Sequence, residues 1–410
     1  MRIESGNQER RISKWMVLLL AAACGLIAAN LYYAQTLVGP IRDAIGLSST
    51  ATGFIVTVTQ IGYVIGLLFI VPVSDIVENR RLSVGMLLVA ALALLTAAFA
   101  TTAPLFLLAA LLIGIGSVVA QILVPLAASL AAEEQRGLVV GNVMSGLLLG
   151  IMLARPAASF VASLWGWRAI FILSAVVIAL LTVLLAYVLP ARKPTKTVRY
   201  GKLILSLGSL WRHTPVLRRR ALYQASLFGA FSLFWTVVPL HLADRFGMSQ
   251  QGIAWFALVG VGGAIAAPIA GRLADRGWSK AMTVTAMVVA VLSFLAIHLF
   301  DRHSTPALIL LFVSAFTLDM AVSGNLVVGQ RSIYALGNEA RGRLNGLFMS
   351  VFFTGGAIGS SVGGWAYEQG GWGLASWIGT ALPLLALGYF LTERRLEKVG
   401  KAAEGVSSAG

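Results

Sequence analysis

Long apolar stretches alternate with short polar turns along almost the whole chain. Twelve of these stretches contain few or no charged side chains. A helix needs about 20 consecutive apolar residues to cross the hydrocarbon core of a bilayer, where it also pairs its own backbone amides. The pattern therefore predicts an all-α membrane protein with twelve transmembrane helices. The stretches lie near residues 15–39, 51–73, 83–101, 104–131, 138–163, 167–189, 221–243, 251–271, 281–300, 305–330, 344–366 and 373–391.

Composition and charge favour a membrane protein with a defined orientation. Hydrophobic residues make up 58% of the 410 residues and charged residues only 11%, whereas soluble proteins carry about 25% charged residues. If the N-terminus is cytoplasmic, the outer loops hold only Arg42, Arg168, Arg245 and Arg302 as basic residues. Basic residues concentrate in cytoplasmic loops, so we expect a multi-pass protein of a bacterial inner membrane with both termini in the cytoplasm. The net charge of +15 then serves orientation and lipid contact rather than nucleic-acid binding.

The chain repeats short patterns at about half its length. The turn at residues 271–280 has a less similar copy at residues 71–81, and each copy joins two apolar stretches. The pattern Glu-x-Arg-Gly-x-x-x-Gly occurs at residues 134–141 and again at residues 339–346. Such internal repeats are typical of transporter folds. The sequence therefore predicts two pseudo-symmetric six-helix bundles.

The repeats also predict the division of the chain. Between the bundles, a basic stretch without acidic residues contains a segment, residues 200–211, with the pattern of a short amphipathic helix at the headgroup surface. We expect an N-terminal bundle at residues 1–189, a basic cytoplasmic linker at 190–220, a C-terminal bundle at 221–392 and a cytoplasmic tail at 393–410.

The repeated turn carries a family resemblance. Gly-x-x-x-Asp-Arg-x-Gly-x-[Arg/Lys] between the second and third helices of each half resembles the signature loop of the major facilitator superfamily of secondary transporters. The copy at residues 271–280 departs little from it, whereas the first copy has Val71, Ile76 and Glu78 where the family prefers Gly, Arg and Gly. The resemblance, which extends over nearly the whole chain, implies a cytoplasmic gate. Its residues would be Asp75, Arg80, Arg81, Gly271, Asp275, Arg276, Lys280, Arg136, Arg341 and Arg343.

Overall similarity is greatest to the drug-efflux and arabinose-efflux-like proton antiporters of that superfamily. This resemblance implies a protein that functions as a monomer among lipids, without a cofactor or metal, and exports a small organic molecule in exchange for protons. The fifth helix departs from the antiporter pattern Gly-x-x-x-Gly-Pro-x-x-Gly-Gly, because Arg155 stands before Pro156 and the later Gly pair is missing. Proton-coupled uptake and facilitated diffusion therefore remain alternatives.

Two charged residues lie well inside the apolar stretches, Arg155 in the fifth and Asp319 in the tenth. Charges in the bilayer core are costly and usually functional. Asp319 is a candidate proton carrier with Arg155 as its partner, although a purely structural salt bridge is the alternative. Spacing on the same helical faces adds further candidates for a proton-coupling and substrate cavity. The set is Asp319, Arg155, Tyr32, Gln35, Ser323 and Gln330.

Small residues recur every four positions in the second, fifth, eighth and eleventh helices, which permits close helix contact. In the superfamily these four helices form the boundary between the two bundles, so the resemblance implies a helix seam there. Ordinary close packing within one bundle is the alternative. The glycines are Gly62, Gly66, Gly146, Gly150, Gly263, Gly355, Gly359 and Gly363.

Other function classes have little support. A membrane-embedded enzyme would show clustered His, Asp or Cys inside the spans, and a sensor would carry an added soluble domain. The chain has no Gly-x-x-x-x-Gly-Lys-[Ser/Thr] loop for ATP. Its four histidines have no metal-ligand spacing and are expected at the surface. The single cysteine, Cys24, excludes an internal disulfide. We therefore expect a transporter rather than an enzyme.

Overall fold

The computed structural model describes residues 12–132, 135–191, 199–299, 304–336 and 341–407, with no side-chain description for Asp275, Arg341 or residues 394–407. The described residues form helices joined by short turns, with no strand among them. The first half of the chain contains α1 (Lys14–Ala29), η1 (Tyr33–Thr36), α2 (Val38–Ile45), η2 (Ser49–Ala51), α3 (Phe54–Ile65), η3 (Gly66–Ile70), η4 (Val71–Asp75), α4 (Asn79–Phe99), α5 (Ala103–Gly116), α6 (Val119–Leu130), α7 (Arg136–Trp165) and α8 (Trp167–Val188).

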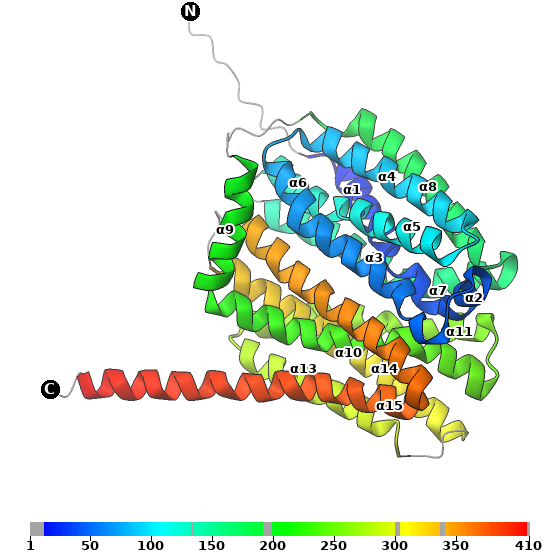
Figure 1. Cartoon of the computed structure of the whole chain (residues 1–410). Helices are drawn as coiled ribbons and strands as arrows, with labels where there is room; N and C mark the ends of the chain where they lie inside the picture. Colours follow the sequence, from blue (N-terminus) through cyan, green and yellow to red (C-terminus); the bar gives the residue numbers. More distant parts are fainter. Residues whose placement is uncertain (1–11, 133–134, 192–198, 300–303, 337–340, 408–410) are drawn as a thin grey trace, which may run out of the picture.

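The second half follows a separate helix, α9 (Tyr200–His213), that lies within the expected linker. In Figure 1 the helices of the first half gather in the upper part of the molecule and most of those of the second half in the lower part. The later elements are α10 (Pro215–Phe246), α11 (Gln250–Ala257), η6 (Leu258–Val261), α12 (Gly262–Asp275), α13 (Ser279–Ala296), α14 (Thr305–Tyr334) and α15 (Arg341–Ser407).

Ten helical segments of the described chain are long and apolar enough to cross a membrane. One of them, Gly342–Glu393, is 52 residues long and contains a break at Gly370 and Gly371, where Gly371 has a φ of 60°. The apolar helix Lys14–Ala29 is shorter, at 16 residues. The expected all-helical membrane architecture is thus confirmed, whereas twelve separate crossings in two six-helix bundles are not established.

Several predicted spans are interrupted near their middle. The first one leaves the α-helix after Ala29, and the amides of Asn30, Leu31 and Tyr32 bond only three residues back before η1 and α2. The stretch from α5 to α6 breaks at Ser117, and the stretch from α11 to α12 passes through η6. Tight 3₁₀ turns inside a span free backbone groups that other side chains must then satisfy. Hydropathy alone, which predicted continuous helices, does not report these breaks.

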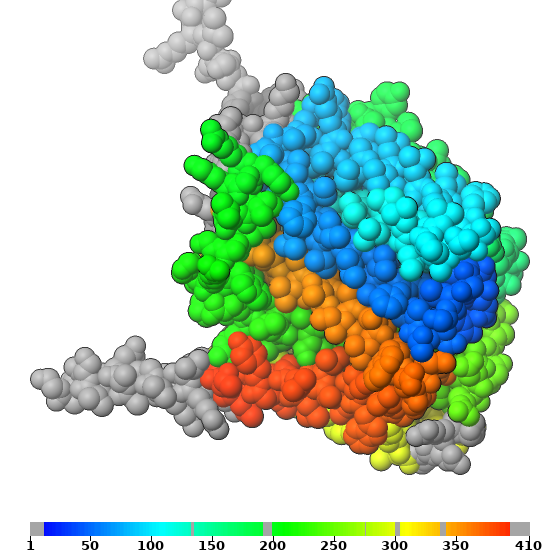
Figure 2. Space-filling model, viewed as in Figure 1, coloured from blue at the N-terminus to red at the C-terminus, as the bar shows by residue number. Residues whose placement is uncertain are grey.

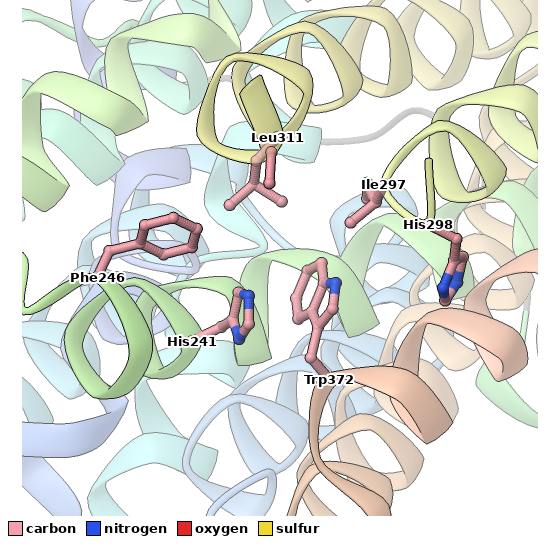
Figure 3. Close-up of a pocket in the computed structure, with 7 residues that line it drawn as sticks. His241, Phe246, Ile297, His298, Leu311 and Trp372 are labelled. Carbon is pink, nitrogen blue, oxygen red and sulfur yellow. The ribbon is translucent and has the colours of Figure 1, made fainter. Parts of the chain in front are cut away.

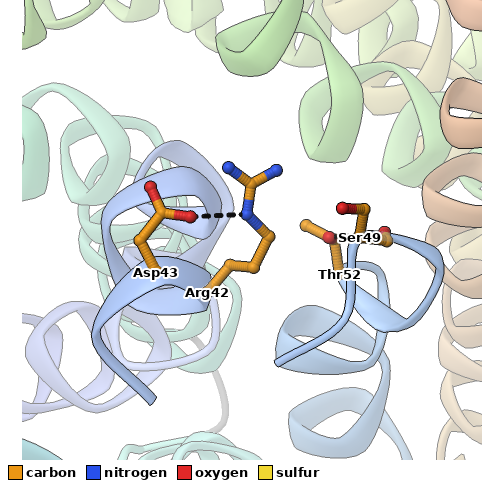
Figure 4. Close-up of polar contacts among 4 residues, drawn as sticks. All are labelled: Arg42, Asp43, Ser49 and Thr52. Atoms are coloured by element: carbon orange, nitrogen blue, oxygen red, sulfur yellow. Dashed lines mark hydrogen bonds and ion pairs between the residues drawn. The ribbon is translucent and has the colours of Figure 1, made fainter. Parts of the chain in front are cut away.

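The bundle has two recognisable ends. We call the end beside α9 the linker end, and the end that carries α2 and η2 the far end (Figure 1). At the far end, Gly46 takes a φ of 66° and ends α2, a left-handed conformation that glycine adopts at little cost. Close by, Arg42 and Asp43 form an exposed ion pair of 2.7 Å, opposite Ser49 and Thr52 (Figure 4). Such exposed pairs contribute little to stability.

The predicted amphipathic helix in the linker is confirmed as α9. Leu203 and Leu207 are buried, whereas Leu205 is 76% exposed. The Tyr200 hydroxyl donates to the backbone oxygen of Phe69 at 2.9 Å, and Arg343 donates to the Ser206 hydroxyl at 2.9 Å. α9 therefore joins α15 of the second half to the first half. Figure 2 shows α9 at the left edge of the molecule, against surfaces from both halves.

The two halves meet where α3 packs on α15 and where α7 packs on α11. At the far end, a Cβ atom added to Gly53 of the α3 segment would collide with the backbone oxygen of Ser360 in α15. In Figure 1, α3 and the first part of α15 run side by side. All four helix runs expected at the boundary, those of α3, α7, α11 and the first part of α15, therefore lie there.

The predicted glycine seam needs a correction, because its glycines face helices of their own half. A Cβ on Gly150 would collide with Gly25 of α1, and one on Gly359 would collide with Gly229 of α10. Gly263 faces Ser323 of α14. The others follow the same rule: Gly62 and Gly66 face α5 and the turn after it, Gly146 faces α1, and Gly355 and Gly363 face α10. The small residues therefore provide close packing within each half, the alternative interpretation of their spacing.

This placement predicts that substituting these glycines destabilises the fold. We expect Gly150→Ala and Gly359→Ala to lower the unfolding midpoint of the purified protein, because overpacking costs about 1–3 kcal/mol and here the obstacle is backbone. Gly141→Ala in the same helix as Gly150 is the control, since a Cβ there meets nothing within 4 Å. Normal thermal stability with lost transport would instead assign these glycines to a moving boundary.

Candidate functional site

The two charged residues predicted inside the spans meet in the structure. Arg155 projects from α7 and Asp319 from α14, and their Nη2 and Oδ1 atoms lie 3.3 Å apart. Arg155 is 1% exposed and Asp319 is 3% exposed. The contact joins a helix of the first half to a helix of the second. A buried pair of this kind is stable only while each charge keeps its partner.

Aromatic residues of α10 complete the surroundings of this pair. The Trp235 indole donates to Asp319 Oδ2 at 2.9 Å. The Arg155 guanidinium carbon lies 4.0 Å from the Trp235 ring centre and 4.9 Å from that of Phe231. These distances permit cation–π attraction. The i, i+4 spacing of Phe231 and Trp235 was a signal in the sequence, but aromatic residues on a buried helix are too common for it to identify a partner of Arg155.

Polar side chains close the far-end side of the pair. Thr36 ends η1 and precedes the N-cap of α2, and its carbonyl has no backbone donor in the described part of the chain. The Gln250 side chain from the second half donates to this carbonyl at 3.0 Å and to Ser159 Oγ at 2.8 Å. The Thr36 hydroxyl donates to the backbone oxygen of Arg155 at 3.3 Å. The broken first span is thus tied to both Arg155 and the other half.

Tyr32 and Gln35, predicted on one face of the first span, lie in its interrupted part. Tyr32 is buried and close enough to interact electrostatically with Arg155 and Asp319. Gln35 has no exposed surface, and neither polar atom of its amide has a hydrogen-bond partner in the described part of the chain. Burying an unsatisfied amide is costly. Gln35 is therefore a candidate for contact with a bound molecule.

The other two predicted cavity residues have different neighbours. Ser323 faces Gly263 of α12. Gln330 donates to Asn345 Oδ1 at 3.3 Å and lies 3.9 Å from the Met349 sulfur. Neither makes a described hydrogen bond to Asp319, whose oxygens bond Arg155 and Trp235. The helical face that Ser323 and Gln330 share with Asp319 did not predict these separate neighbours, because α14 contacts different helices along its length.

Polar contacts join the halves on both sides of the ion pair. Towards the far end, the Thr57 and Ser360 hydroxyls lie 2.7 Å apart. Gln60 donates to Ser232 Oγ at 2.9 Å, next to Phe231 in α10. Towards the linker end, Asn345 donates to Gln121 Oε1 at 3.2 Å. The structure therefore encloses the pair between two layers of inter-half contacts.

Most of the predicted gate residues lie at the linker end. Arg80 and Arg81 both pair with buried Glu78, at 3.3 and 3.2 Å. Glu78 stands where the family prefers glycine, and its two ion pairs hold both arginines within the first copy of the turn. Asp75 is exposed at the end of η4. Its expected pairing with Arg341 or Arg343 stays a prediction, because the Arg341 side chain lies outside the described residues.

In the second copy of the turn, the contact predicted for the aspartate is likewise untested. Gly271 packs against the Arg331 side chain of α14, while Arg276 and Lys280 are exposed. The Asp275 side chain lies outside the described residues, so its approach to the start of α7 stays a prediction. Arg136, at that start, donates to the backbone oxygen of Ala128 at 3.2 Å.

A cavity of about 120 Å³ lies inside the second half. Figure 3 shows the rings of His241 and Trp372 face to face, with centres 4.5 Å apart. His241 is only 4% exposed, so its expected place at the surface is wrong. His298 bonds Ser376 at 3.0 Å. The wall residues are His241, Phe246, Ile297, His298, Ala307, Leu311 and Trp372.

Comparison with known proteins gives consistent results. A sequence model described as "Major Facilitator Superfamily" matches residues 18–276 and 220–409. The chain is 41% identical to an uncharacterized transporter, YgaY, of Escherichia coli O157:H7, over 92% of this chain and 95% of that protein. It is 24% identical to the chloramphenicol efflux pump Rv0191 of Mycobacterium tuberculosis, over 60% of each. A solved structure of a D-xylose–proton symporter has a TM-score of 0.71 at 16% identity, covering 90% of this chain and 96% of that one.

The buried pair makes a prediction about stability. We expect Arg155→Ala to destabilise the protein by about 3–5 kcal/mol, because it leaves the Asp319 carboxylate buried without its counter-charge. The double variant Arg155→Met with Asp319→Asn should be closer to the wild type, since it removes both charges. Thermal unfolding in detergent measures the difference. A double variant less stable than Arg155→Ala would show that the pair itself stabilises the fold.

Proposed function

This chain belongs to the major facilitator superfamily of transporters, and we propose that it moves a small organic molecule across a bacterial inner membrane by proton-coupled alternating access. The observation that carries the proposal is the buried ion pair of Arg155 and Asp319, which joins the two halves. Because the family and the relatives are transporters, an enzymatic role has no support beside it.

The pair offers a physical route for coupling a proton to movement. When Arg155 and Asp319 are in contact, their charges offset each other. If the halves move apart, Asp319 loses this partner. A charge at the bilayer centre costs at least about 2.5–3.5 kcal/mol, and binding a proton removes that cost from the carboxylate. Proton binding and separation of the halves therefore favour each other.

The two layers of polar contacts are the proposed gates. Thr57 with Ser360 closes the far end, and Gln121 with Asn345 closes the linker end. Neutral hydroxyl and amide pairs suit this task, because each contact contributes only about 0.5–1.5 kcal/mol and can be exchanged for water. Asp75 and Asp275 of the two signature turns would add to the linker-end gate, as the family resemblance implies.

The proposed topology follows from charge. The linker end carries α9 and the paired arginine-rich turns, so it is the cytoplasmic side, with both termini there. The break at Gly370 and Gly371 divides α15 into two crossings, and the short first helix continues through η1 and α2 as another. Together with the nine remaining apolar segments these make twelve crossings. A monomer surrounded by lipid is sufficient for this mechanism.

Two directions of coupling are open to such a site. A cationic substrate would compete with the proton for Asp319, which gives exchange and therefore export driven by proton entry. Relatives described as a chloramphenicol efflux pump and a probable sugar efflux transporter favour export. A substrate that engages Arg155 would instead travel with the proton, which gives uptake. The contacts of Arg155, analysed below, favour this second direction.

The proposal predicts a specific defect for Asp319→Asn. We expect this variant to lose accumulation of substrate driven by a pH gradient, while equilibration down the substrate's own gradient persists, because only the proton site is removed. A substrate library tested in inverted vesicles, with and without a pH gradient, provides the assay. Asp43→Asn, which changes an exposed carboxylate at the far end, is the control. Full gradient-driven transport by Asp319→Asn would leave the pair a purely structural salt bridge.

The gates predict a reversible block by cross-linking. In a Cys24→Ala background, we expect oxidation of Thr57→Cys with Ser360→Cys to stop transport and a reductant to restore it, because the far end can no longer open. The matched control is Ser293→Cys with Thr317→Cys, whose hydroxyls are also 2.7 Å apart but belong to the same half. The idea is wrong if the cross-linked Thr57–Ser360 pair transports as fast as its reduced form.

A further inference from the structure

The hydrogen-bonding needs of the central pair are met unequally. Both oxygens of Asp319 are occupied, Oδ1 by Arg155 Nη2 and Oδ2 by the Trp235 indole. Two donor atoms of Arg155, Nε and Nη1, are buried and have no hydrogen-bond partner in the described part of the chain. Arg155 therefore lacks acceptors for two of its donors, whereas each oxygen of Asp319 already accepts one hydrogen bond.

We propose that the transported molecule is a small organic monoanion of the carboxylate type, bound by the unsatisfied donors of Arg155. This inference rests on the proposed function and names its substrate class. A guanidinium presents planar, fixed donors that match the oxygens of a carboxylate. A cation would lie beside the positive charge of Arg155 and would compete at Asp319 with Arg155 and the Trp235 indole.

The residues around Arg155 indicate what the rest of the transported molecule is like. Phe231, which contacts the guanidinium, stacks on Phe228 at 5.3 Å, and Phe228 stacks on Phe352 at 3.8 Å. Phe353 extends this row of rings to Tyr63 in α3, at 4.5 Å. The row crosses from the second half to the first. Its rings offer offset and edge contacts to an aromatic or apolar body, and the amide of Gln35 can bond one further polar group.

Charge balance then sets the direction of coupling. An anion that binds Nε and Nη1 of Arg155 leaves the buried site with one excess negative charge, and a proton on Asp319 restores neutrality. Binding of the anion and binding of the proton therefore favour each other, and by linkage each increases the affinity for the other. Substrate and proton travel in the same direction, which is uptake in a membrane energised by proton entry.

Three molecules of nearly the same shape separate the charge classes: benzoate, neutral benzamide and cationic benzamidine. We expect benzoate to raise the unfolding midpoint of the purified full-length protein and to give a measurable Kd by calorimetry, with benzamide weaker and benzamidine without effect. Its affinity should increase as the pH falls from about 8 to about 6, towards the limit of tenfold per pH unit for one linked proton. Other aromatic monocarboxylates should behave in the same way.

Variants assign the binding to Arg155. We expect Arg155→Gln to weaken benzoate binding about 10- to 100-fold, the range for hydrogen bonds to a charged group, and Arg155→Lys to be intermediate because the charge remains. If Arg155→Gln is unstable, the double variant with Asp319→Asn, which buries no lone charge, takes its place. Arg168→Gln is the matched control, because Arg168 also lies over a tryptophan, Trp167 at 4.4 Å, but in another part of the first half.

The outcomes separate this inference from the proposed function. Benzamidine binding that depends on Asp319 would overturn the inference in favour of a cation, and equal binding of benzamide would overturn it in favour of a neutral molecule. If neither benzoate nor any other aromatic monocarboxylate tested binds, the inference is also overturned. If benzoate binds through Arg155 but Asp319→Asn retains both its pH dependence and proton-driven transport, the substrate class stands and the proton role of Asp319 fails.

Discussion

The charges of Arg155 and Asp319 are the constraint on which the rest of the site depends. Neither group can remain ionised alone in a region from which water is excluded. Their contact obliges α7, α14 and the Trp235 side of α10 to meet at one place. A movement that separates the halves must therefore supply a new partner for each charge. A proton for the carboxylate and an anion for the guanidinium meet both needs at once.

The irregular backbone around the pair follows from the same exclusion of water. The 3₁₀ turns of the first span free carbonyl groups that cannot be left unbonded in a membrane. The Gln250 side chain bonds one of them, the carbonyl of Thr36, from the opposite half. The break in the helix is thereby also a link between the halves. The break also brings the first span next to Arg155, because the Thr36 hydroxyl donates to the backbone oxygen of that residue.

The contacts within each half differ in kind from many of the contacts between the halves. Within each half, glycines such as Gly150 and Gly359 bring helix backbones into direct contact, and such contacts leave no space for relative movement. Between the halves, the contacts include neutral polar pairs such as Thr57 with Ser360 and Gln121 with Asn345, together with the close backbone approach of Gly53 to Ser360. The polar pairs can be replaced by water at small cost. The polar pairs between the halves suit the proposed alternating access, in which the halves move relative to each other.

The sequence by itself determined the features that depend on local composition. Apolar stretches of spanning length, the repeated turns and the distribution of basic residues predicted a helical transporter, and the amphipathic pattern of residues 200–211 predicted α9. The rarity of charges inside spans singled out Arg155 and Asp319. Only the tertiary structure decided that these two meet, that Trp235 and Phe231 enclose them, and that the glycine stripes turn inward. Helical periodicity states which residues share a face but not which helix that face meets, because this choice depends on contacts between segments far apart in the chain.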